Sequence, residues 1–351
     1  MTALIPYFDG HNDALLRLYK DPSGNAVTGF LNGGGKGHID LPRAREGGFV
    51  GGIFALFSPP KGKPPDFSAG TVLNLQLPPV LPPMEAAVAV MGEIAMLLRV
   101  IAASGGQVSL CTDVPAIRAA IARKSLAVVL HIEGADAIDE DLYLLDVLHR
   151  VGLRSLGPLW SRPNLFGHGV PMTFPGSPDI GDGLTDAGKR LVRECNRLKI
   201  MLDVSHLNEK GFWDIVALSD APVIATHSNV HAIAASPRNL TMRQLDAIRD
   251  SNGLVGVTFA TSYLRTDGAM SPDTAMDLLV HHIDGLIELL GENRVGIGSD
   301  FDGAAIPAAI GSVSGSQVVF EALRKHGYDE PLLRKIGAEN WLAALERTWG
   351  A

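Results

Sequence analysis

The amino-acid sequence predicts an α/β protein whose core is a (β/α)8, or TIM-type, barrel of the metal-dependent hydrolase kind. Short apolar, β-branched runs recur along the 351 residues, and helical patterns separate most of them. The runs are apolar throughout rather than alternating, which is typical of strands buried on both faces of a parallel sheet. Repeated alternation of strand and helix favours the barrel over the alternative, an open doubly wound sheet.

The expected strands are short, and each is apolar along its whole length. They fall at residues 4–8, 51–57, 126–132, 153–159, 200–204, 223–225, 254–259 and 295–297. Helical patterns are expected at residues 85–103, 141–151, 186–198, 209–218, 241–250 and 274–290. The second of these patterns is amphipathic, with an apolar stripe that we assign to Leu142, Leu145, Val147 and Leu148.

The chain is expected to form a single barrel domain, residues 1–351, with one Pro-rich excursion at about residues 58–84. This excursion contains KGKPPDF and LPPVLPP, which hold too many prolines for a helix and predict an extended surface segment. The Gly-rich stretch GGGKG at residues 33–37 is expected to be a flexible loop. It lacks both the spacing of a phosphate-binding loop and a following helical pattern.

Composition and charge limit the class of function. Hydrophobic residues make up 46% of the chain and charged residues 19%, so the sequence can build a sizeable core. The formal net charge of −8 argues against general binding to nucleic acid or to an anionic membrane surface. The N-terminus has no pattern of a secretion signal, and no uninterrupted apolar stretch is expected to reach the length that spans a membrane.

Two cysteines, Cys111 and Cys195, lie far apart in the sequence and show no CxxC spacing. They give no support to a disulfide framework or a Cys-rich zinc site, and predict buried free thiols in a reducing compartment. We therefore expect a cytoplasmic protein with no membrane anchor and no nucleic-acid partner. Its assembly stays open between a single chain and a homodimer.

Several of the expected strands end in side chains that bind metals or transfer protons. In a (β/α)8 barrel the carboxyl ends of all strands face one mouth, so such side chains converge although they are distant in sequence. Their joint occurrence at equivalent points of successive βα units favours a site over isolated buried histidines. The strand ends carry His11, Asp13, Glu133, His206, His227 and Asp300.

The donor set predicts bound divalent metal ions. Imidazole and carboxylate in this proportion suit Zn²⁺ or another divalent first-row metal. Five ligands are too many for one tetrahedral zinc ion that keeps an open position, and they fit two ions that share a carboxylate. The expected ligands are His11, Asp13, Glu133, His206 and His227.

Other histidines and aspartates are expected to support this centre or to lie apart from it. His131 alternates with Glu133 along its strand, so we assign it to packing or to support of the ligands. Asp9, Asp203 and Asp302 are expected to cap, to orient a ligand histidine or to hold a loop. No metal role is expected for the histidines in helical stretches or loops, namely His38, His149, His231, His281 and His282.

A series of motifs, in this order, resembles the renal-type (membrane) dipeptidase family. They are FDGHNDAL, HIDLPRAREGGFVGGIFALF, HIEGAD, DVSHL, THSN, SPRNL and GIGSDFDG, and the similarity continues into GAENWLAAL near the C-terminus. The resemblance covers nearly the whole chain, and the shared order of the motifs makes it specific. It implies a (β/α)8 barrel with two zinc ions that hydrolyses dipeptides, including those with a D-residue at the C-terminal position.

The resemblance also implies how the metal ligands divide between the two ions. His11 and Asp13 would bind one zinc ion, and His206 and His227 would bind the other. Glu133 would bridge the two ions.

Three further residues take roles from the resemblance. Arg238, in SPRNL, would bind the C-terminal carboxylate of the substrate, because a planar guanidinium fits a carboxylate bidentately. Asp300 would transfer protons during hydrolysis. Tyr263, in FATSYL, would assist near the carbonyl oxygen of the scissile bond.

One stretch departs from the family pattern. Eukaryotic members carry a histidine after the fourth strand that contacts the reacting centre, whereas this chain has Trp160 at that point, in LRSLGPLWSRPNLFG. The role of that histidine would be vacant or would pass to Asn164 or His168. Trp160 and Asn164 are therefore expected to line the substrate site.

Two other functions stay open on the sequence. The first is a barrel-type metal-dependent hydrolase of a lactone, cyclic amide or phosphoester, but the HxH opening common in that group is replaced by His11-Asn12-Asp13. The second is a catalytically silent barrel kept for binding, which has no need of a complete ligand set together with Asp300. The dipeptidase is therefore the preferred hypothesis.

Overall fold

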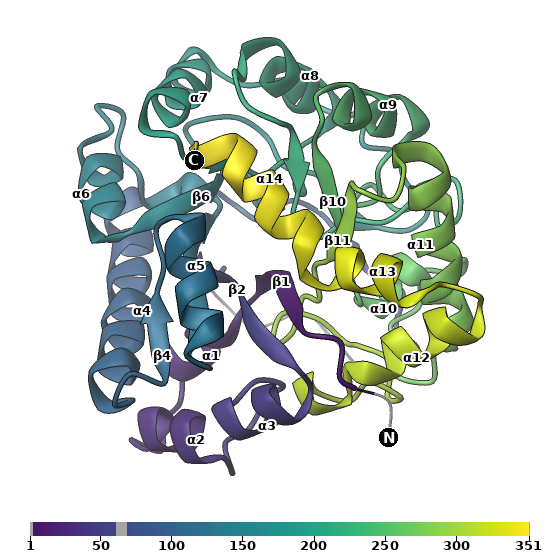
Figure 1. Ribbon diagram of the computed structural model, residues 1–351. Helices are drawn as coiled ribbons and strands as arrows, with labels where there is room; N and C mark the ends of the chain where they lie inside the picture. The colour runs from purple at the N-terminus through teal and green to yellow at the C-terminus, as the bar shows by residue number, and fades with distance from the viewer. Residues whose placement is uncertain (1–2, 61–68, 351) are drawn as a thin grey trace.

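The computed structural model describes residues 3–60 and 69–350, and its centre is a barrel of parallel strands surrounded by helices (Figure 1). Every residue of the barrel strands β1, β5 and β10 is buried, as expected for strands covered on both faces. The barrel strands are β1 Tyr7–Asn12, β2 Phe49–Phe57, β5 Leu126–Glu133, β6 Leu153–Gly157, β8 Met201–Leu202, β9 Ile224–Ala225, β10 Leu254–Val257 and β11 Val295–Ile297.

Strand pairing closes the barrel almost completely. The strand order within the described residues is β8-β6-β5-β2-β1-β11-β10-β9, and all neighbouring pairs along this path are parallel. A parallel bridge between Asp203 and Ile224 joins the two ends of the path. The predicted (β/α)8 barrel is therefore confirmed, and the open doubly wound sheet is excluded because its edge strands would stay apart.

Each expected apolar run overlaps a barrel strand, although several bounds shift. The first strand begins later than expected, at Tyr7, and extends past His11, which lies inside the strand rather than after it. Three short strands were not expected. β4 (Val108–Leu110) pairs parallel with the first residues of β5, and β3 (Asn74–Leu75) pairs antiparallel with β7 (Met172–Thr173). Strands of two or three residues are too short to show a periodic pattern.

Helices surround the barrel, and those expected from the sequence correspond to α4, α6, α7, α8, α9 and α11. The α-helices are α1 Ala14–Tyr19, α2 Ala26–Asn32, α3 Leu41–Glu46, α4 Pro83–Ala103, α5 Val114–Ala122, α6 Tyr143–Val151, α7 Asp186–Leu198, α8 Glu209–Leu218, α9 Met242–Asp250, α10 Thr261–Leu264, α11 Met276–Leu290, α12 Gln317–Lys325, α13 Glu330–Arg334 and α14 Asn340–Trp349. Shorter turns are the 3₁₀ helices η1 Ala135–Ala137 and η2 Val313–Gly315, and the π-helix η3 Lys335–Glu339.

Side-chain caps fix where several of these helices begin. Thr185 accepts a hydrogen bond from a backbone N–H in the first turn of α7, and Asn208 does the same for α8. Thr241 and Gln244 form a reciprocal capping box at the start of α9. These caps stand directly before the apolar pattern of each helix, which is why the bounds of α7, α8 and α9 could be predicted closely.

Two expectations about the helices are wrong. Val147 is 49% exposed on α6, because it lies about 200° around the helix from the buried Leu145. The helix α3 follows the Gly-rich stretch although no helix was expected there, and Asp40 caps it by accepting from the backbone N–H of Arg43. Of the Pro-rich excursion, residues 61–68 lie outside the described residues.

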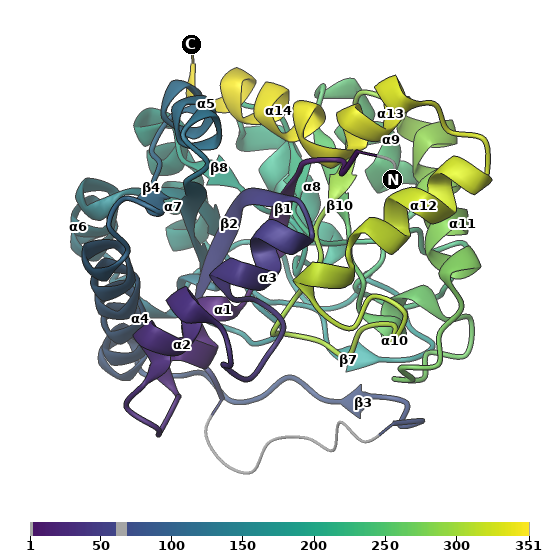
Figure 2. The same ribbon diagram turned by 60° about the horizontal axis from the view of Figure 1, so that its bottom comes forward.

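No uninterrupted apolar stretch reaches membrane-spanning length, but one helix interrupted by a few charges is long and apolar enough. By length and composition, α4 is the one helix among the described residues that could cross a membrane, with a hydropathy of 2.0 over its most apolar stretch. It begins at Pro83. Proline is tolerated at this first position because a backbone N–H there would have no partner within the helix. Figure 2 shows α4 along the outer flank of the barrel.

The C-terminal helix α14 lies across the end of the barrel where the strands begin (Figure 1). Trp341 of this helix is fully buried, and its Nε1–H donates to the backbone carbonyl of Ile297 at 2.8 Å. Gly10, Gly256 and Gly296 line the indole, and a Cβ at any of the three would overlap the ring. The indole therefore fills a space that stays open because these three strand positions are glycines.

Replacing Trp341 with alanine should lower the free energy of unfolding by about 3–5 kcal/mol, because it removes a buried indole from a space that backbone cannot refill. Urea denaturation followed by circular dichroism measures this loss. Trp213→Ala, at a half-buried position on α8, is the control and should cost clearly less. Equal losses for the two variants would contradict the role given to Trp341 in closing the barrel.

Candidate metal centre

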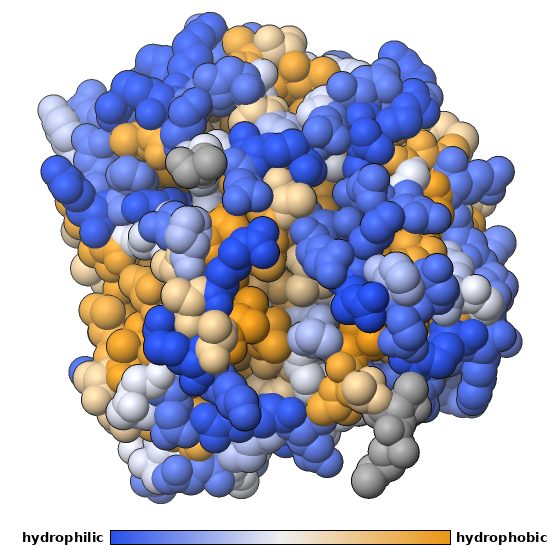
Figure 3. All heavy atoms as spheres, viewed as in Figure 1, coloured by the Kyte–Doolittle hydropathy of each residue, from blue (hydrophilic) through white to orange (hydrophobic). Residues whose placement is uncertain are grey.

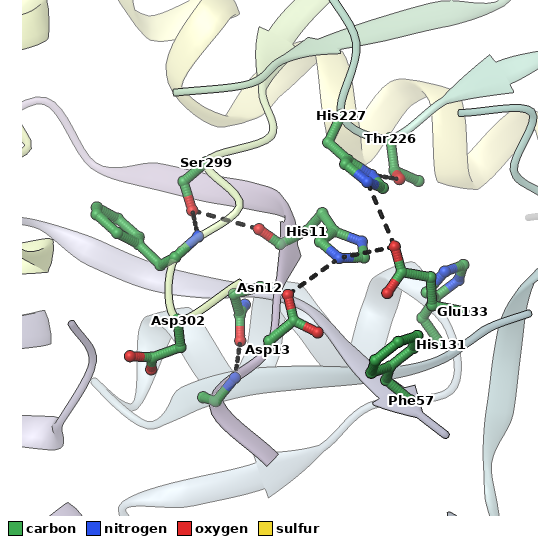
Figure 4. A network of polar contacts seen from close by, with 12 residues as sticks. His11, Asn12, Asp13, Phe57, His131, Glu133, Thr226, His227, Ser299 and Asp302 are labelled. Atoms are coloured by element: carbon green, nitrogen blue, oxygen red, sulfur yellow. Dashed lines mark hydrogen bonds and ion pairs between the residues drawn. The ribbon is translucent and has the colours of Figure 1, made fainter. Parts of the chain in front are cut away.

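The carboxyl ends of the barrel strands bring together all six side chains that the sequence places at the centre. Figure 4 shows His11, Asp13, Glu133 and His227 among them. The five expected metal ligands are each at most 5% exposed. β1 contributes His11 and ends just before Asp13, β5 ends with Glu133, and the segments after β8, β9 and β11 carry His206, His227 and Asp300. Barrel topology thus explains why residues almost 300 positions apart in sequence meet in space.

Glu133 lies in the middle of three imidazoles. Its Oε1 is 2.9 Å from Nε2 of His206 and 3.4 Å from Nε2 of His227. The same oxygen is 3.6 Å from Nε2 of His11. The two Nε2 atoms of His206 and His227 are 3.2 Å apart. One carboxylate oxygen therefore faces the ligand atoms of all three histidines.

The ligand atoms fall into two groups on either side of this carboxylate. Among residues 3–60 and 69–350, one group with atoms within 4.8 Å of one another joins Glu133, His206 and His227. A second such group joins His11, Asp13 and Asp300. The second group places Asp300 close enough to be a metal ligand as well as a proton carrier.

A third possible group includes Asp203 with two of the histidines. Asp203 is a poorer ligand, because both of its oxygens already accept hydrogen bonds. Oδ1 accepts from the hydroxyl of Ser205 at 2.6 Å, and Oδ2 accepts from the hydroxyl of Thr226, also at 2.6 Å. We therefore assign Asp203 to holding the segments that carry the ligand histidines, as expected.

The hydroxyl of Thr226 sets the tautomer of His227. Because this hydroxyl gives its only proton to Asp203, it can only accept from Nδ1 of His227, which lies 2.8 Å away. Nδ1 then carries the proton, and the lone pair of the imidazole is on Nε2, the atom that faces Glu133. Nδ1 of His206 contacts the hydroxyl of Ser161 at 3.1 Å in a similar arrangement.

Burial keeps two of the imidazoles neutral, which is the state that binds metals. It lowers the pKa of His206 and of His227 well below the usual value, and the nearby charges of Arg238 and His11 lower it further. Burial shifts the pKa of the carboxyl groups in the opposite direction, upward. Burial raises the pKa of Glu133 to about 8 and that of Asp300 to about 6, and the Asp13 carboxylate adds to both shifts.

These residues fit divalent metal ions. Both ring nitrogens of His11 are buried and have no hydrogen-bond partner among the described residues. Such nitrogens are costly to bury unless a ligand satisfies them. A cation at the centre would satisfy His11 and would stabilise the ionised form of the Glu133 carboxyl. Imidazole and carboxylate donors in these numbers suit zinc or another first-row metal.

Arg238 offers hydrogen-bond donors beside the metal ligands. It is 2% exposed, and its Nη2 donates to the backbone carbonyl of His227 at 3.3 Å. Its Nε and Nη1 atoms have no partner among the described residues. The guanidinium stacks on the ring of Tyr263, with its Cζ atom 5.4 Å from the ring centroid. A buried guanidinium with unused donors is a site for an anionic group.

Trp160 forms an aromatic wall beside the ligands. Its ring centroid lies 4.9 Å from that of Phe57 and 6.0 Å from that of His206. The guanidinium of Arg162 lies over the indole, with its Cζ atom 5.6 Å from the ring centroid. Arg162 is itself held by a buried ion pair with Asp136, whose Oδ1 accepts from Nε at 2.9 Å. The position of the indole is therefore fixed from two sides.

Asn164 is engaged by its own loop. Its Nδ2 donates to the carbonyl of Pro158 at 2.9 Å, and its Oδ1 accepts from the backbone N–H of Phe166 at 2.8 Å. Both ends of the amide thus bind backbone, which favours a loop-holding role over contact with substrate. His168 lies against Gly181, and among the described residues no hydrogen bond or ion pair joins it to the metal ligands.

The supporting residues lie where the sequence places them. His131 packs edge-on against His11 at 5.6 Å and contacts the hydroxyl of Ser155 at 2.8 Å. Asp9 accepts from the backbone N–H and the hydroxyl of Ser299, which holds the β11 segment. Asp302 accepts from Arg17 and so holds a loop.

Sequence reasoning missed some of the residues that orient the site, namely Thr226, Ser161, Asp136 and Arg162. Thr226 and Ser161 each stand next to a residue that was singled out, so adjacency is the one signal that could have found them. Asp136 follows Glu133 by three positions and Arg162 follows Trp160 by two. Their ion pair joins segments 26 residues apart, and no periodicity connects them.

Comparisons with known proteins agree on one family. Residues 1–349 match the family model described as membrane dipeptidase, peptidase family M19. A metallopeptidase from Rhodobacter sphaeroides, solved with a phosphinate mimic of the dipeptide L-Ala-D-Ala, is 52% identical with a TM-score of 0.96, covering 99% of this chain and 100% of that chain. A structure described as dipeptidase AC, a metallopeptidase of family M19, is 53% identical with a TM-score of 0.94 and the same coverage. An uncharacterized protein in the pqqA 5′ region of Klebsiella pneumoniae is 46% identical over 257 residues, covering 73% of this chain and 95% of that protein.

Replacing Glu133 with glutamine should lower bound metal and turnover together. The amide keeps the shape of the side chain but removes the charge that faces three imidazoles, so it is a weaker ligand. Elemental analysis and activity are measured on the same sample. Glu140→Gln, at an exposed position, is the control and should change neither. Normal turnover with full metal content in the Glu133 variant would contradict the central place given to this carboxylate.

Proposed function

The chain belongs to the membrane dipeptidase family, peptidase family M19, and from this premise we propose that it hydrolyses free dipeptides with two zinc ions. That it is a metallopeptidase with a dipeptide as its class of substrate follows from the family and its solved relatives. The proposal adds the number and identity of the ions, the residues that hold them, and acceptance of a D-residue at the C-terminal position.

The observation that carries the proposal is the buried guanidinium of Arg238, with unused donors beside the metal ligands. A free α-carboxylate supplies two oxygens that match two N–H groups of a planar guanidinium. If the scissile carbonyl lies between the metal ligands, only the residue after it can place its carboxylate at Arg238. This geometry favours dipeptides over longer chains.

Two ions are supported by the division of the ligands into two groups on either side of Glu133. Two divalent ions held there would polarise the scissile carbonyl and make the attacking water more acidic. The Glu133 carboxylate would screen their positive charges from each other. His206 and His227 contribute neutral imidazoles, since burial keeps the pKa of each low.

The protein groups then handle protons and the developing charge. Asp300 accepts the proton of the attacking water and returns it to the leaving amine, a role suited to a carboxyl whose pKa burial raises to about 6. Burial raises the pKa of Tyr263 to about 12, so its phenol stays protonated and can donate to the oxyanion. Trp160 gives the pocket an apolar wall that favours apolar second residues.

Acceptance of a D-residue is supported by the Rhodobacter sphaeroides relative, whose bound ligand mimics L-Ala-D-Ala. For location, we propose the cytoplasm, because Cys111 and Cys195 are both buried free thiols.

The proposal is tested by comparing an L,L-dipeptide, the L,D-dipeptide and the C-terminal amide of the L,L form. Loss of the charge-assisted contact with Arg238 should make kcat/KM for the amide about a hundredfold lower than for the free acid. Both free dipeptides should be cleaved. In Arg238→Met the preference for the acid should disappear, because both substrates then lack the contact.

Two results would count against this account. Equal cleavage of acid and amide by the natural enzyme would remove Arg238 as the carboxylate-binding group. Failure to cleave either free dipeptide, with metal bound, would move the assignment to the hydrolases of lactones or cyclic amides.

Asp300→Asn should keep the fold while losing turnover by about a hundred- to ten-thousand-fold, the usual contribution of acid–base catalysis. Asparagine suits this position because Asp300 has a positive φ of 61°, a conformation that asparagine tolerates. Metal content is measured alongside kcat. Loss of metal before loss of turnover would make Asp300 a ligand, and the proton acceptor would be another group.

A further inference from the structure

The turn after β11, which carries Asp300, contains two residues in the left-handed backbone region. Asp300 has a φ of 61° and Asp302 a φ of 68°. Side chains other than glycine seldom adopt this conformation, because it brings the Cβ atom too close to the backbone. Residues held in it persist only where the surrounding contacts fix them. The position of Asp300 beside the metal ligands therefore depends on what holds this turn.

Contacts from β1 hold the turn on the side that precedes Asp300. The backbone N–H and the hydroxyl of Ser299 both donate to the carboxylate of Asp9, each at 2.7 Å. The backbone N–H of Asp300 itself donates to the carbonyl of His11 at 3.0 Å. These contacts fix where the turn begins. The side that follows Asp300 needs an anchor of its own.

Asp302 supplies that second anchor, and its partners come from outside the barrel. The backbone N–H of His38 donates to Oδ1 of Asp302 at 2.6 Å, and the backbone N–H of Asp302 donates to Nδ1 of His38 at 2.9 Å. Nε of Arg17 donates to the other oxygen, Oδ2, at 2.9 Å. The Asp302 carboxylate points away from Glu133 (Figure 4). Both of its oxygens are thus used to hold the turn.

The reciprocal contact requires a neutral His38 imidazole. Because the backbone N–H of Asp302 donates to Nδ1, this nitrogen carries the lone pair and the ring proton is on Nε2. Burial lowers the pKa of His38, and although Asp302 raises it, the charges of Arg17 and Arg43 lower it further. An asparagine could replace the imidazole in this contact, because its Oδ1 is an acceptor the same number of bonds from Cα. A leucine could not.

The Gly-rich stretch explains how His38 comes so close to the turn. Its last residue, Gly37, has a φ of 88°, and a Cβ there would lie 2.2 Å from Cδ of Arg17 and 2.4 Å from Oδ1 of Asp302. Nη1 of Arg43 in α3 donates to the carbonyl of Gly37 at 2.7 Å. Figure 3 shows a largely hydrophilic surface over α2 and α3, at the bottom of the view. Polar contacts therefore hold this end of the stretch against the turn.

We propose that His38 is a positioning residue for Asp300, which it places by fixing Asp302 two positions further along the turn. The inference rests on the proton-carrying role proposed for Asp300. It gives the Gly-rich stretch a function: the glycine at its end lets a histidine from outside the barrel reach the turn after β11.

A small movement of the turn would change the distance over which Asp300 transfers a proton. The turn is closely packed: a Cβ at Gly303 would lie 2.1 Å from Oδ2 of Asp13 and 2.4 Å from Oδ1 of Asp300. Proton transfer needs an approach of about 2.6–3.2 Å, and a displacement of about 1 Å can cost on the order of a hundredfold in rate. Arg238 lies on another segment, so substrate binding should not change.

The test compares His38→Leu with the natural enzyme. We expect kcat for a free dipeptide to fall by about ten- to a hundredfold, with KM changed by less than about twofold and with full metal content. His38→Asn, which keeps an acceptor, should restore most of the lost kcat. His149→Leu, also at a half-buried position, is the control and should change neither constant. The unfolding midpoint of each variant shows that it is folded.

Two glycine variants test the same contact from the loop. Gly37→Ala places a Cβ against Arg17 and Asp302 and should lower kcat without a change in KM. Gly34→Ala is the control, because Gly34 has a similar φ of 84° but a Cβ there meets no atom within 4 Å in the described part of the chain. Both variants strain the backbone alike. An equal fall in kcat for the two would assign the effect to the loop backbone and overturn the proposal.

A double variant separates this inference from the proposed function. In Asp300→Asn, the further change His38→Leu should lower kcat no more, because its effect passes through the Asp300 carboxylate. Full turnover by Asp300→Asn would remove the proton role on which the inference rests. If Asp300→Asn loses turnover while the folded His38→Leu does not, only the positioning role is wrong. Loss of metal in His38→Leu, or an additional loss of kcat in the double variant, would also overturn it.

Discussion

The burial of Glu133 among three imidazoles is the constraint on which the rest of the site depends. Burial raises the pKa of this carboxyl to about 8, so its ionised form is strongly destabilised by its surroundings. Bound cations would remove that penalty, because they would favour the ionised carboxylate and bind His11 nitrogens that have no hydrogen bond among the described residues. Metal binding would therefore stabilise the barrel mouth, as in other metal sites where ligands cannot stay buried alone.

The expected ligands could be predicted from the sequence because barrel topology determines where the end of each strand lies in space. Glu133 and His227 stand at the ends of apolar runs, and parallel strands in a closed barrel all end at the same mouth. Orientation was harder to predict. The tautomer of His227 depends on a proton that Thr226 gives to Asp203, a chain of contacts that follows only from geometry. The amide of Asn164 proved to be occupied by backbone, which no pattern in the sequence indicates.

The two ends of the barrel differ in role: one end is closed by apolar packing, and the other carries the candidate metal ligands. At one end, strand residues without side chains leave room for the indole of Trp341, so packing there is close and apolar. At the other end, the strands finish in polar groups that hydroxyls and an ion pair satisfy in part and that bound cations would satisfy further. The sequence showed the polar end through its charged residues. The packing of α14 and of α4 depends on which side of each helix faces the barrel, and the apolar composition of α4 does not show which side that is.

The central claim is that two ions share Glu133, and zinc titration of the metal-free enzyme tests it most directly. Dipeptide hydrolysis is followed as zinc is added in known ratio to the chain. The account predicts that activity rises until two equivalents are bound and then stays level. Full activity at one equivalent, with no further gain at two, would contradict it.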